Sequence, residues 1–233
     1  MKKLSYYFFK KRLLRDNLFA LVLSLLIIGF IFLFFFFGAA IGNLVILEDL
    51  IKFDHQLHSY LLSARTSGLI NFFLLITSLA STSFAVSVSI VFVILLFFKK
   101  NKNYLLPFFI SLLGGMLTNF LSKFLIRRLR PIEPVYTEIS YSFPSAHSTL
   151  AVVLYGFIFY YFWKQAKKRA TKNLILVFGI LLILAIGFSR IYLGVHFFSD
   201  VVGGYLLGLA WLCGGIGLAQ WRLKKRIQKM IIV

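Results

Sequence analysis

The sequence predicts an all-α, polytopic membrane protein with six transmembrane helices and with its N- and C-termini in the cytoplasm. Hydrophobic residues make up 60% of the 233 residues, charged residues make up 14%, and the mean hydropathy is +0.89. A soluble domain of this length could not bury so many apolar side chains. The formal net charge is +19, but the basic residues do not form one stripe with interleaved aromatic residues, so nucleic-acid binding is not predicted.

Short basic clusters between the apolar runs indicate which loops are cytoplasmic. The clusters lie before Asn17 and at residues 99–102, 164–172 and 222–229. Lys and Arg are enriched in cytoplasmic loops of membrane proteins. The outer regions are then residues 41–68, 127–146 and 189–197.

The first half of the chain predicts two crossings and an interfacial segment. Residues 18–37 are apolar throughout, and a run of about 20 residues favours an uncleaved transmembrane helix over a signal peptide. Residues 41–68 mix charged residues and histidines with Leu and Ile, which is typical of a segment at the outer membrane interface. Residues 69–82 predict the approach to a second span that ends at Lys99.

The second half predicts four more crossings around a proline-containing outer loop at residues 127–145. The predicted spans cover residues 104–126, 147–163, 174–188 and 198–220. Neither a repeat nor a linker is visible, so the prediction is one domain over residues 1–233. Gly204 and Gly208 have a spacing that allows close helix approach, either inside the monomer or in a dimer.

The first candidate site group lies at the end of the third apolar run. Lys123 and Arg130 are seven residues apart, so on one helix that Pro131 ends they would share a face and present two cations. A charge as deep in an apolar run as Lys123 is costly and indicates a function. Extension of both cations to the lipid headgroups is the alternative, and it is the interpretation given to Arg127 and Arg128.

The second group is the segment at residues 143–147, just before the fourth apolar run. Ser145 is a natural N-cap residue, and the backbone N–H groups of Ala146 and His147 would form an anion site at the helix start. His147 beside that site could donate a proton to a leaving oxygen. Ordinary capping with an interfacial histidine is the alternative.

The third group is Ser189 and Arg190, followed by His196 and Asp200. His196 and Asp200 are four residues apart, so on a helix that begins near His196 the carboxylate could orient one imidazole nitrogen and leave the other nucleophilic. The guanidinium of Arg190 matches phosphate oxygens. A His–Asp pair that only fastens a loop to a helix is the alternative.

These three groups resemble the motifs of the type 2 phosphatidic acid phosphatase family in order and spacing. They read Lys123-x6-Arg130-Pro131, Pro144-Ser145-Ala146-His147 and Ser189-Arg190-x5-His196-x3-Asp200. The motif region covers residues 123–200. The predicted six-helix plan is similar to bacterial members that act on phosphatidylglycerophosphate or undecaprenyl diphosphate.

The resemblance implies a lipid phosphatase that forms a phosphohistidine. His196 would attack phosphorus, Asp200 would orient His196, and His147 would protonate the leaving group. The phosphate would be held by Lys123, Arg130, Ser145, Ala146 and Arg190. The resemblance implies no metal and no cofactor. Ala146 stands where the family usually has glycine, and it keeps the backbone N–H unless the position needs a glycine-only dihedral angle.

Several points stay open at the level of sequence. Phosphatidylglycerophosphate, phosphatidic acid and undecaprenyl diphosphate all remain candidate substrates, and the oligomeric state is not indicated. The expected location is a bacterial cytoplasmic membrane, with the site facing outward. For Asp54, His55 and His58 the alternatives are a segment that shapes substrate entry and simple interfacial anchoring, and the second is favoured. Alternatives from other classes are a non-catalytic lipid-phosphate-binding protein, a transporter, and a relative of the vanadium haloperoxidases.

Overall fold

The computed structural model describes the backbone of residues 45–232 and the side chains of residues 48–224, and every regular element in this range is helical. The predicted all-α class is confirmed for this part of the chain, whereas the predicted span at residues 18–37 lies outside it. The elements are α2 (Val45–Ser63), α3 (Ser67–Ser78), α4 (Thr82–Phe98), η1 (Lys102–Tyr104), α5 (Leu105–Ile126), α6 (Ala146–Leu150), η2 (Ala151–Tyr155), α7 (Gly156–Gln165), α8 (Arg169–Tyr192) and α9 (Phe198–Ile232).

Four of the described helical stretches are long and apolar enough to cross a membrane. They are Lys102–Ile126, Ala146–Gln165, Arg169–Tyr192 and Phe198–Lys224. Helices α3 and α4 meet at a bend of 43° and pass the same test when taken together, which gives up to five spans. This broken pair corresponds to the predicted approach and second span.

The last two spans differ from the sequence-based bounds. Helix α8 covers 24 residues, because it begins at Arg169 instead of Leu174 and because Ser189 and Arg190 continue the helix instead of opening the outer loop. The loop predicted at residues 189–197 is therefore only 193–197. Helix α9 runs on to Ile232 instead of ending near Gln220. The fourth span is one helical run in which residues 151–155 form a π-helical turn.

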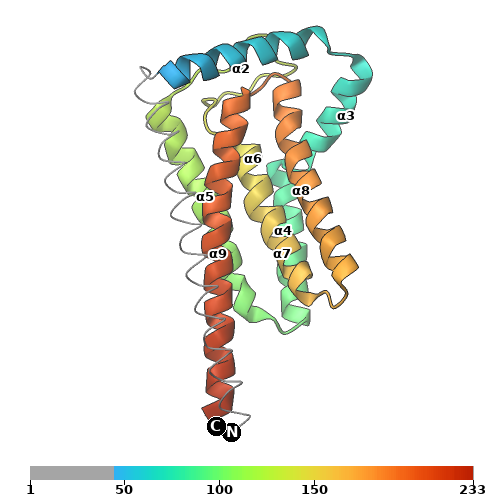
Figure 1. Ribbon diagram of the computed structural model, residues 1–233, viewed down its shortest axis with the longest axis vertical. Coiled ribbons are helices and arrows are strands. Elements are labelled where there is room, and N and C mark those ends of the chain that lie inside the picture. The colour runs from blue at the N-terminus through green and yellow to red at the C-terminus, as the bar shows by residue number, and fades with distance from the viewer. Residues whose placement is uncertain (1–44, 233) are drawn as a thin grey trace.

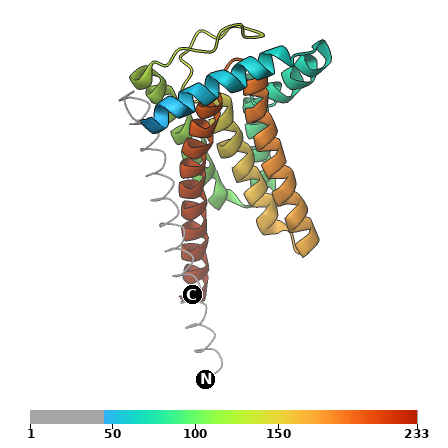
Figure 2. The same ribbon diagram turned by 45° about the horizontal axis from the view of Figure 1, so that its top comes forward.

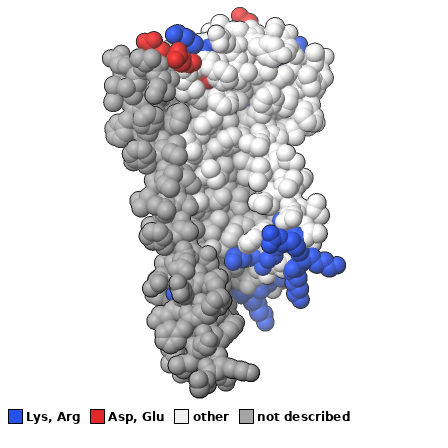
Figure 3. Space-filling view, viewed as in Figure 1, with Lys and Arg blue, Asp and Glu red and all other residues white. Residues whose placement is uncertain are grey.

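Helix α2 lies across one end of a bundle formed by the spanning helices (Figures 1 and 2). Its buried positions include Asp54, His58 and Leu61, which follow one another by four and three residues and so share a face. That face turns two polar side chains toward the bundle. Basic side chains gather at the opposite end of the molecule (Figure 3), where the predicted cytoplasmic loops lie.

Close contact between α9 and the α6–η2 segment depends on two glycines. A Cβ atom on Gly204 would lie 2.6 Å from the Ser145 carbonyl oxygen, and one on Gly208 would lie 2.7 Å from Cβ of Val152. The spacing of these glycines therefore serves packing inside the monomer. It also brings the N-terminal half of α9 directly against Ser145.

Candidate active site

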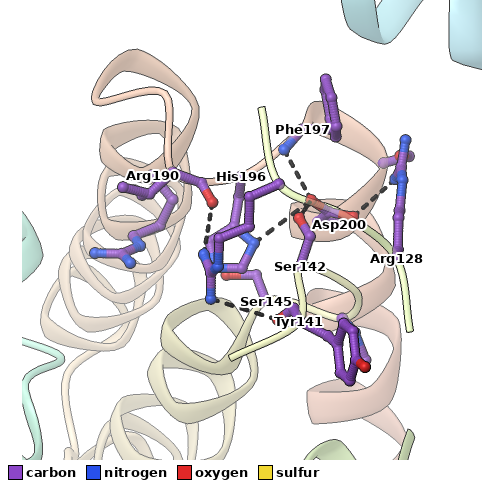
Figure 4. A network of polar contacts seen from close by, with 12 residues as sticks. Arg128, Tyr141, Ser142, Ser145, Arg190, His196, Phe197 and Asp200 are labelled. Atoms are coloured by element: carbon purple, nitrogen blue, oxygen red, sulfur yellow. Dashed lines mark hydrogen bonds and ion pairs between the residues drawn. The ribbon is translucent and has the colours of Figure 1, made fainter. Parts of the chain in front are cut away.

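The three predicted groups meet at the end of the bundle that α2 covers. They come from the C-terminal ends of α5 and α8, the N-terminal ends of α6 and α9, and the loops at residues 127–145 and 193–197. Figure 4 shows Asp200 between His196 and Arg128, with Arg190 on the far side of the imidazole.

The His196 and Asp200 side chains lie side by side as the spacing predicts, but Nδ1 of His196 makes no hydrogen bond among the described residues. His196 precedes α9 by two residues, and Asp200 lies in the first turn. Asp200 Oδ2 lies 3.5 Å from His196 Nδ1, and both side chains are buried. The other nitrogen, Nε2, lies 3.3 Å from an Nη atom of Arg130. The carboxylate therefore faces Nδ1 and leaves Nε2 toward the cationic side of the site.

Asp200 is held by more groups than His196. Its Oδ2 accepts hydrogen bonds from the Phe197 backbone N–H at 2.8 Å and from the Ser142 hydroxyl. Its Oδ1 accepts one from Arg128 at 2.7 Å. Because a buried carboxylate is stable only when it is paired, these donors keep Asp200 ionised and fixed.

Two guanidinium groups face the imidazole and share one carboxylate. Glu138 pairs with Arg130 at 2.6 Å and also with Arg190. Arg190 is fully buried and donates to Thr77 Oγ1 at 2.7 Å and to the Tyr136 hydroxyl, while its Nε atom has no partner among the described residues. Burial would raise the pKa of the Glu138 carboxyl, but the charges of Arg190, His196 and Arg130 outweigh burial and hold the pKa at about 2.

Lys123 and Arg130 lie close together, but not because they share a face of one helix. Helix α5 ends at Ile126, where Arg127 adopts a left-handed conformation with φ of 51°, so Arg130 lies in the loop and the shared-face argument is wrong. The loop returns Arg130 to the site, where its Nη1 atom donates to the Val195 carbonyl at 2.6 Å. Lys123 is buried and donates to the Tyr141 carbonyl.

The segment around Ser145 starts a helix as predicted. The Ser145 side chain accepts from the Ser148 N–H, which confirms the N-cap. The N–H groups of Ala146 and His147 belong to the first turn, so the helix itself supplies no acceptor for them. His147 interacts electrostatically with Arg190, Glu138 and His196. The structure thus places a partly buried imidazole beside the guanidinium pair.

The chain matches a known family over more than half of its length. The model of the PAP2 superfamily aligns with residues 85–224. The chain belongs to the PAP2 superfamily. The matched segment contains all three motifs, which confirms the resemblance seen in the sequence.

Similar proteins in this superfamily include lipid phosphatases. Phosphatidylglycerophosphatase B of Bacillus subtilis is 35% identical over 138 residues, which are 58% of this chain and 67% of that protein. Undecaprenyl-diphosphatase of Sulfolobus acidocaldarius is 30% identical over 51% of this chain and 56% of that protein. The crystal structure of a transmembrane PAP2-type phosphatidylglycerolphosphate phosphatase from Bacillus subtilis superimposes with a TM-score of 0.70 and 30% identity, over 79% of this chain and 92% of that one. The chain is therefore a membrane protein with the fold of PAP2 lipid phosphatases.

Ala146 does not depend on a glycine-only conformation. It lies in α6, and it is not among the described non-glycine residues with positive φ, which are Lys100, Arg127 and Glu133. We expect Ala146→Gly to leave kcat/KM within about threefold of wild type, because either residue presents the same N–H. Steady-state phosphate release measures this, and a gain or loss of more than tenfold, on the order of 1.4 kcal/mol in the barrier, would contradict it.

Sequence reasoning missed three charged residues of this PAP2 site. Arg128 and Asp54 were assigned to the membrane interface, but Arg128 pairs with both Asp54 and Asp200. Glu138 received no role, although it joins Arg130 and Arg190. A useful signal was available for Asp54, since it is an acidic residue on the face of α2 that also carries Leu61.

Among the described side chains, no three His, Cys, Asp or Glu residues form a cluster suited to a metal ion.

The protonation of His196 gives a pH prediction. Burial lowers the pKa of the His196 imidazole to about 4, against the opposing effect of Asp200. The imidazole should therefore stay neutral from pH 7 down to about pH 5 and gain a proton only as the pH falls through about 4. Imidazole NMR of the substrate-free protein in detergent measures the midpoint, with the resonance assigned by its loss in His196→Gln. A midpoint near the ordinary value of about 6.5 would contradict the prediction.

Proposed function

We propose that the protein hydrolyses a phosphate monoester or diphosphate of a membrane lipid through a phosphohistidine at His196. The observation that carries this proposal is the orientation of the imidazole. Nδ1 faces the buried Asp200 carboxylate, and Nε2 lies 3.3 Å from an Nη atom of Arg130, which shares Glu138 with Arg190. A neutral imidazole in this setting is an oriented nucleophile next to an anion-binding site.

The phosphate is bound by Lys123, Arg130, Arg190, Ser145 and Ala146. A substrate phosphate replaces Glu138 as the partner of the two guanidinium groups, and it uses the unpartnered Nε of Arg190. The first-turn N–H groups after Ser145 supply further donors. These groups neutralise the charge that develops on the phosphoryl oxygens, so the reaction proceeds without a metal.

His147 acts as the proton donor in the first step. As Nε2 of His196 bonds to phosphorus, the bond to the lipid or phosphate leaving oxygen breaks and His147 gives that oxygen a proton. In the second step His147 removes a proton from water, which attacks the phosphohistidine and releases phosphate. Nδ1 of His196 keeps its proton throughout, with the Asp200 carboxylate 3.5 Å away to stabilise the positive charge.

The site faces outward in a one-domain protein of six spans with both termini in the cytoplasm. The α3–α4 pair and the four described long helices give five of these spans. The sixth is the span predicted from the sequence at residues 18–37, which lie outside the described residues. The site lies under α2, and a large group of Lys and Arg side chains lies at the other end (Figure 3), as expected for the cytoplasmic side. A bacterial cytoplasmic membrane fits this arrangement.

Phosphatidylglycerophosphate, phosphatidic acid and undecaprenyl diphosphate are the candidate substrates. The first and third correspond to the names of the similar proteins from Bacillus and Sulfolobus. The decisive experiment measures phosphate release from each lipid by the purified protein in detergent with EDTA, beside His196→Ala. Release that survives EDTA and disappears in the variant supports the proposal and ranks the substrates. Release that requires a metal, or that persists in His196→Ala, contradicts it.

A further inference from the structure

Asp54 is a buried acidic residue that the proposed reaction does not use. It lies on α2, outside the three motifs, and its side chain has 0% exposure. A buried carboxylate is costly unless charged or polar donors surround it. The donors around Asp54 belong to the residues that hold the catalytic pair.

Asp54 binds the first turn of α9. Its Oδ1 accepts from the Ser199 backbone N–H at 3.0 Å, and its Oδ2 accepts from the Ser199 hydroxyl. Ser199 directly precedes Asp200, and its N–H has no acceptor inside α9 because it lies in the first turn. Asp54 therefore caps α9 from another helix, with its negative charge at the positive end of the helix dipole.

Arg128 connects Asp54 to Asp200. One end of its guanidinium donates to Asp54 Oδ2 at 2.8 Å, and the other donates to Asp200 Oδ1 at 2.7 Å and to Ser199 Oγ at 2.6 Å. The same group lies 4.6 Å from the centre of the Phe197 ring. Because a guanidinium is planar and rigid, fixing one end fixes the other.

We infer that Asp54 and Arg128 are positioning residues that make α2 part of the active site. Asp54 holds Arg128, and Arg128 holds Oδ1 of Asp200, so that Oδ2 stays turned toward Nδ1 of His196. The inference rests on the proposed function, because it requires His196 to be the nucleophile. Neither residue is placed against the phosphate, so their loss lowers kcat and leaves KM nearly unchanged.

Two further contacts fix α2 over the same loop. His58 Nε2 lies 2.9 Å from the Ile132 carbonyl oxygen, and Arg65, just after α2, donates to the Glu133 carbonyl at 2.7 Å. Ile132 and Glu133 follow Arg128 and Arg130 in this loop. Helix α2 is thus attached on both sides of the phosphate-binding arginine, and a shift of α2 moves Arg128 with it.

The test compares Asp54→Asn with Asp49→Asn in the full chain. Asn keeps the size of Asp and one acceptor oxygen but removes the charge. Asp49 is exposed, and among the described side chains it pairs with Lys52 alone, at 3.5 Å. With dioctanoyl phosphatidic acid and undecaprenyl diphosphate as probes, Asp54→Asn should lower kcat by about 10- to 100-fold with KM within about threefold of wild type. Asp49→Asn should change neither. Thermal unfolding in detergent checks that Asp54→Asn is folded.

A second pair of variants keeps the test decisive if Asp54→Asn does not fold. Arg128→Lys should retain more kcat than Arg128→Gln, because Lys can still pair with Asp200 but cannot hold both carboxylates. Where Asp54→Asn folds, the double variant Asp54→Asn/Arg128→Gln should lose no more kcat than Arg128→Gln alone, because Asn at position 54 keeps an acceptor for Ser199 and the charge of Asp54 acts on Asp200 through Arg128.

The outcomes separate this inference from the proposed function. Three results would overturn the positioning role even if His196→Gln is inactive. They are a folded Asp54→Asn with wild-type kcat, an effect of Asp54→Asn on KM alone, and additive losses of kcat in the double variant. Full activity in His196→Gln, or no release by the wild-type protein, would overturn the proposed function and the inference with it.

Discussion

Replacement of His196 by Gln is expected to lower kcat by about 10⁴-fold or more, because it removes the atom that bonds to phosphorus. Glutamine is polar and close to histidine in size, so it disturbs the packing near Asp200 little. The loss should therefore appear without a large change in thermal stability. Phosphate release at saturating substrate, measured on protein of matched purity, gives the ratio.

The matched control for this variant is His55→Gln. His55 is exposed on α2, and its ring meets the Phe197 ring edge to face at 5.1 Å. Because no step of the mechanism uses His55, we expect the control to keep most of the wild-type rate. If His196→Gln keeps more than about a tenth of wild-type kcat, a loss of only 1.4 kcal/mol, His196 is not the nucleophile.

Replacement of Asp200 by Asn is expected to lower kcat by about 10²- to 10⁴-fold, with a smaller effect on KM. The amide can donate a hydrogen bond to Nδ1, which would favour the tautomer that carries its proton on Nε2 and cannot attack phosphorus. It also removes the charge that stabilises the cationic phosphohistidine. Arg128 would keep Asp54 as its remaining carboxylate partner.

Kinetics of Asp200→Asn should be measured beside Asp49→Asn, which makes the same chemical change at an exposed position. A pure rise in KM in Asp200→Asn would show that Asp200 helps bind the substrate and does not orient His196. Unchanged kinetics would remove Asp200 from the mechanism altogether.

The sequence predicts the fold best where an apolar run ends at charged residues. The third span is predicted at residues 104–126 and observed as α5, Leu105–Ile126. The fifth span is predicted too short because Ser189 and Arg190 were interpreted as its end. Buried partners hold Arg190 in the helix, among them Thr77, and such a contact 113 residues away cannot be derived from local pattern.

The parts of the candidate site that are predicted well are contacts between residues a few positions apart in the sequence. The proximity of His196 to Asp200 and the Ser145 cap both belong to short segments at the start of a helix. The contacts of Arg128 join residues 72 and 74 positions apart, and they depend on how α2 folds over the bundle. Sequence alone therefore indicates the proposed nucleophile and the residue proposed to orient it, but not the residues that contact Asp200 from α2 and the loop.

Direct detection of the covalent intermediate tests the central claim. The purified protein would be mixed with phosphatidic acid labelled with ³²P in the phosphate, stopped within milliseconds in base, and digested for mass spectrometry. The account predicts acid-labile, base-stable phosphate on the peptide that contains His196, and none in His196→Gln. Hydrolysis without a labelled peptide, or with phosphate on another residue, would contradict it.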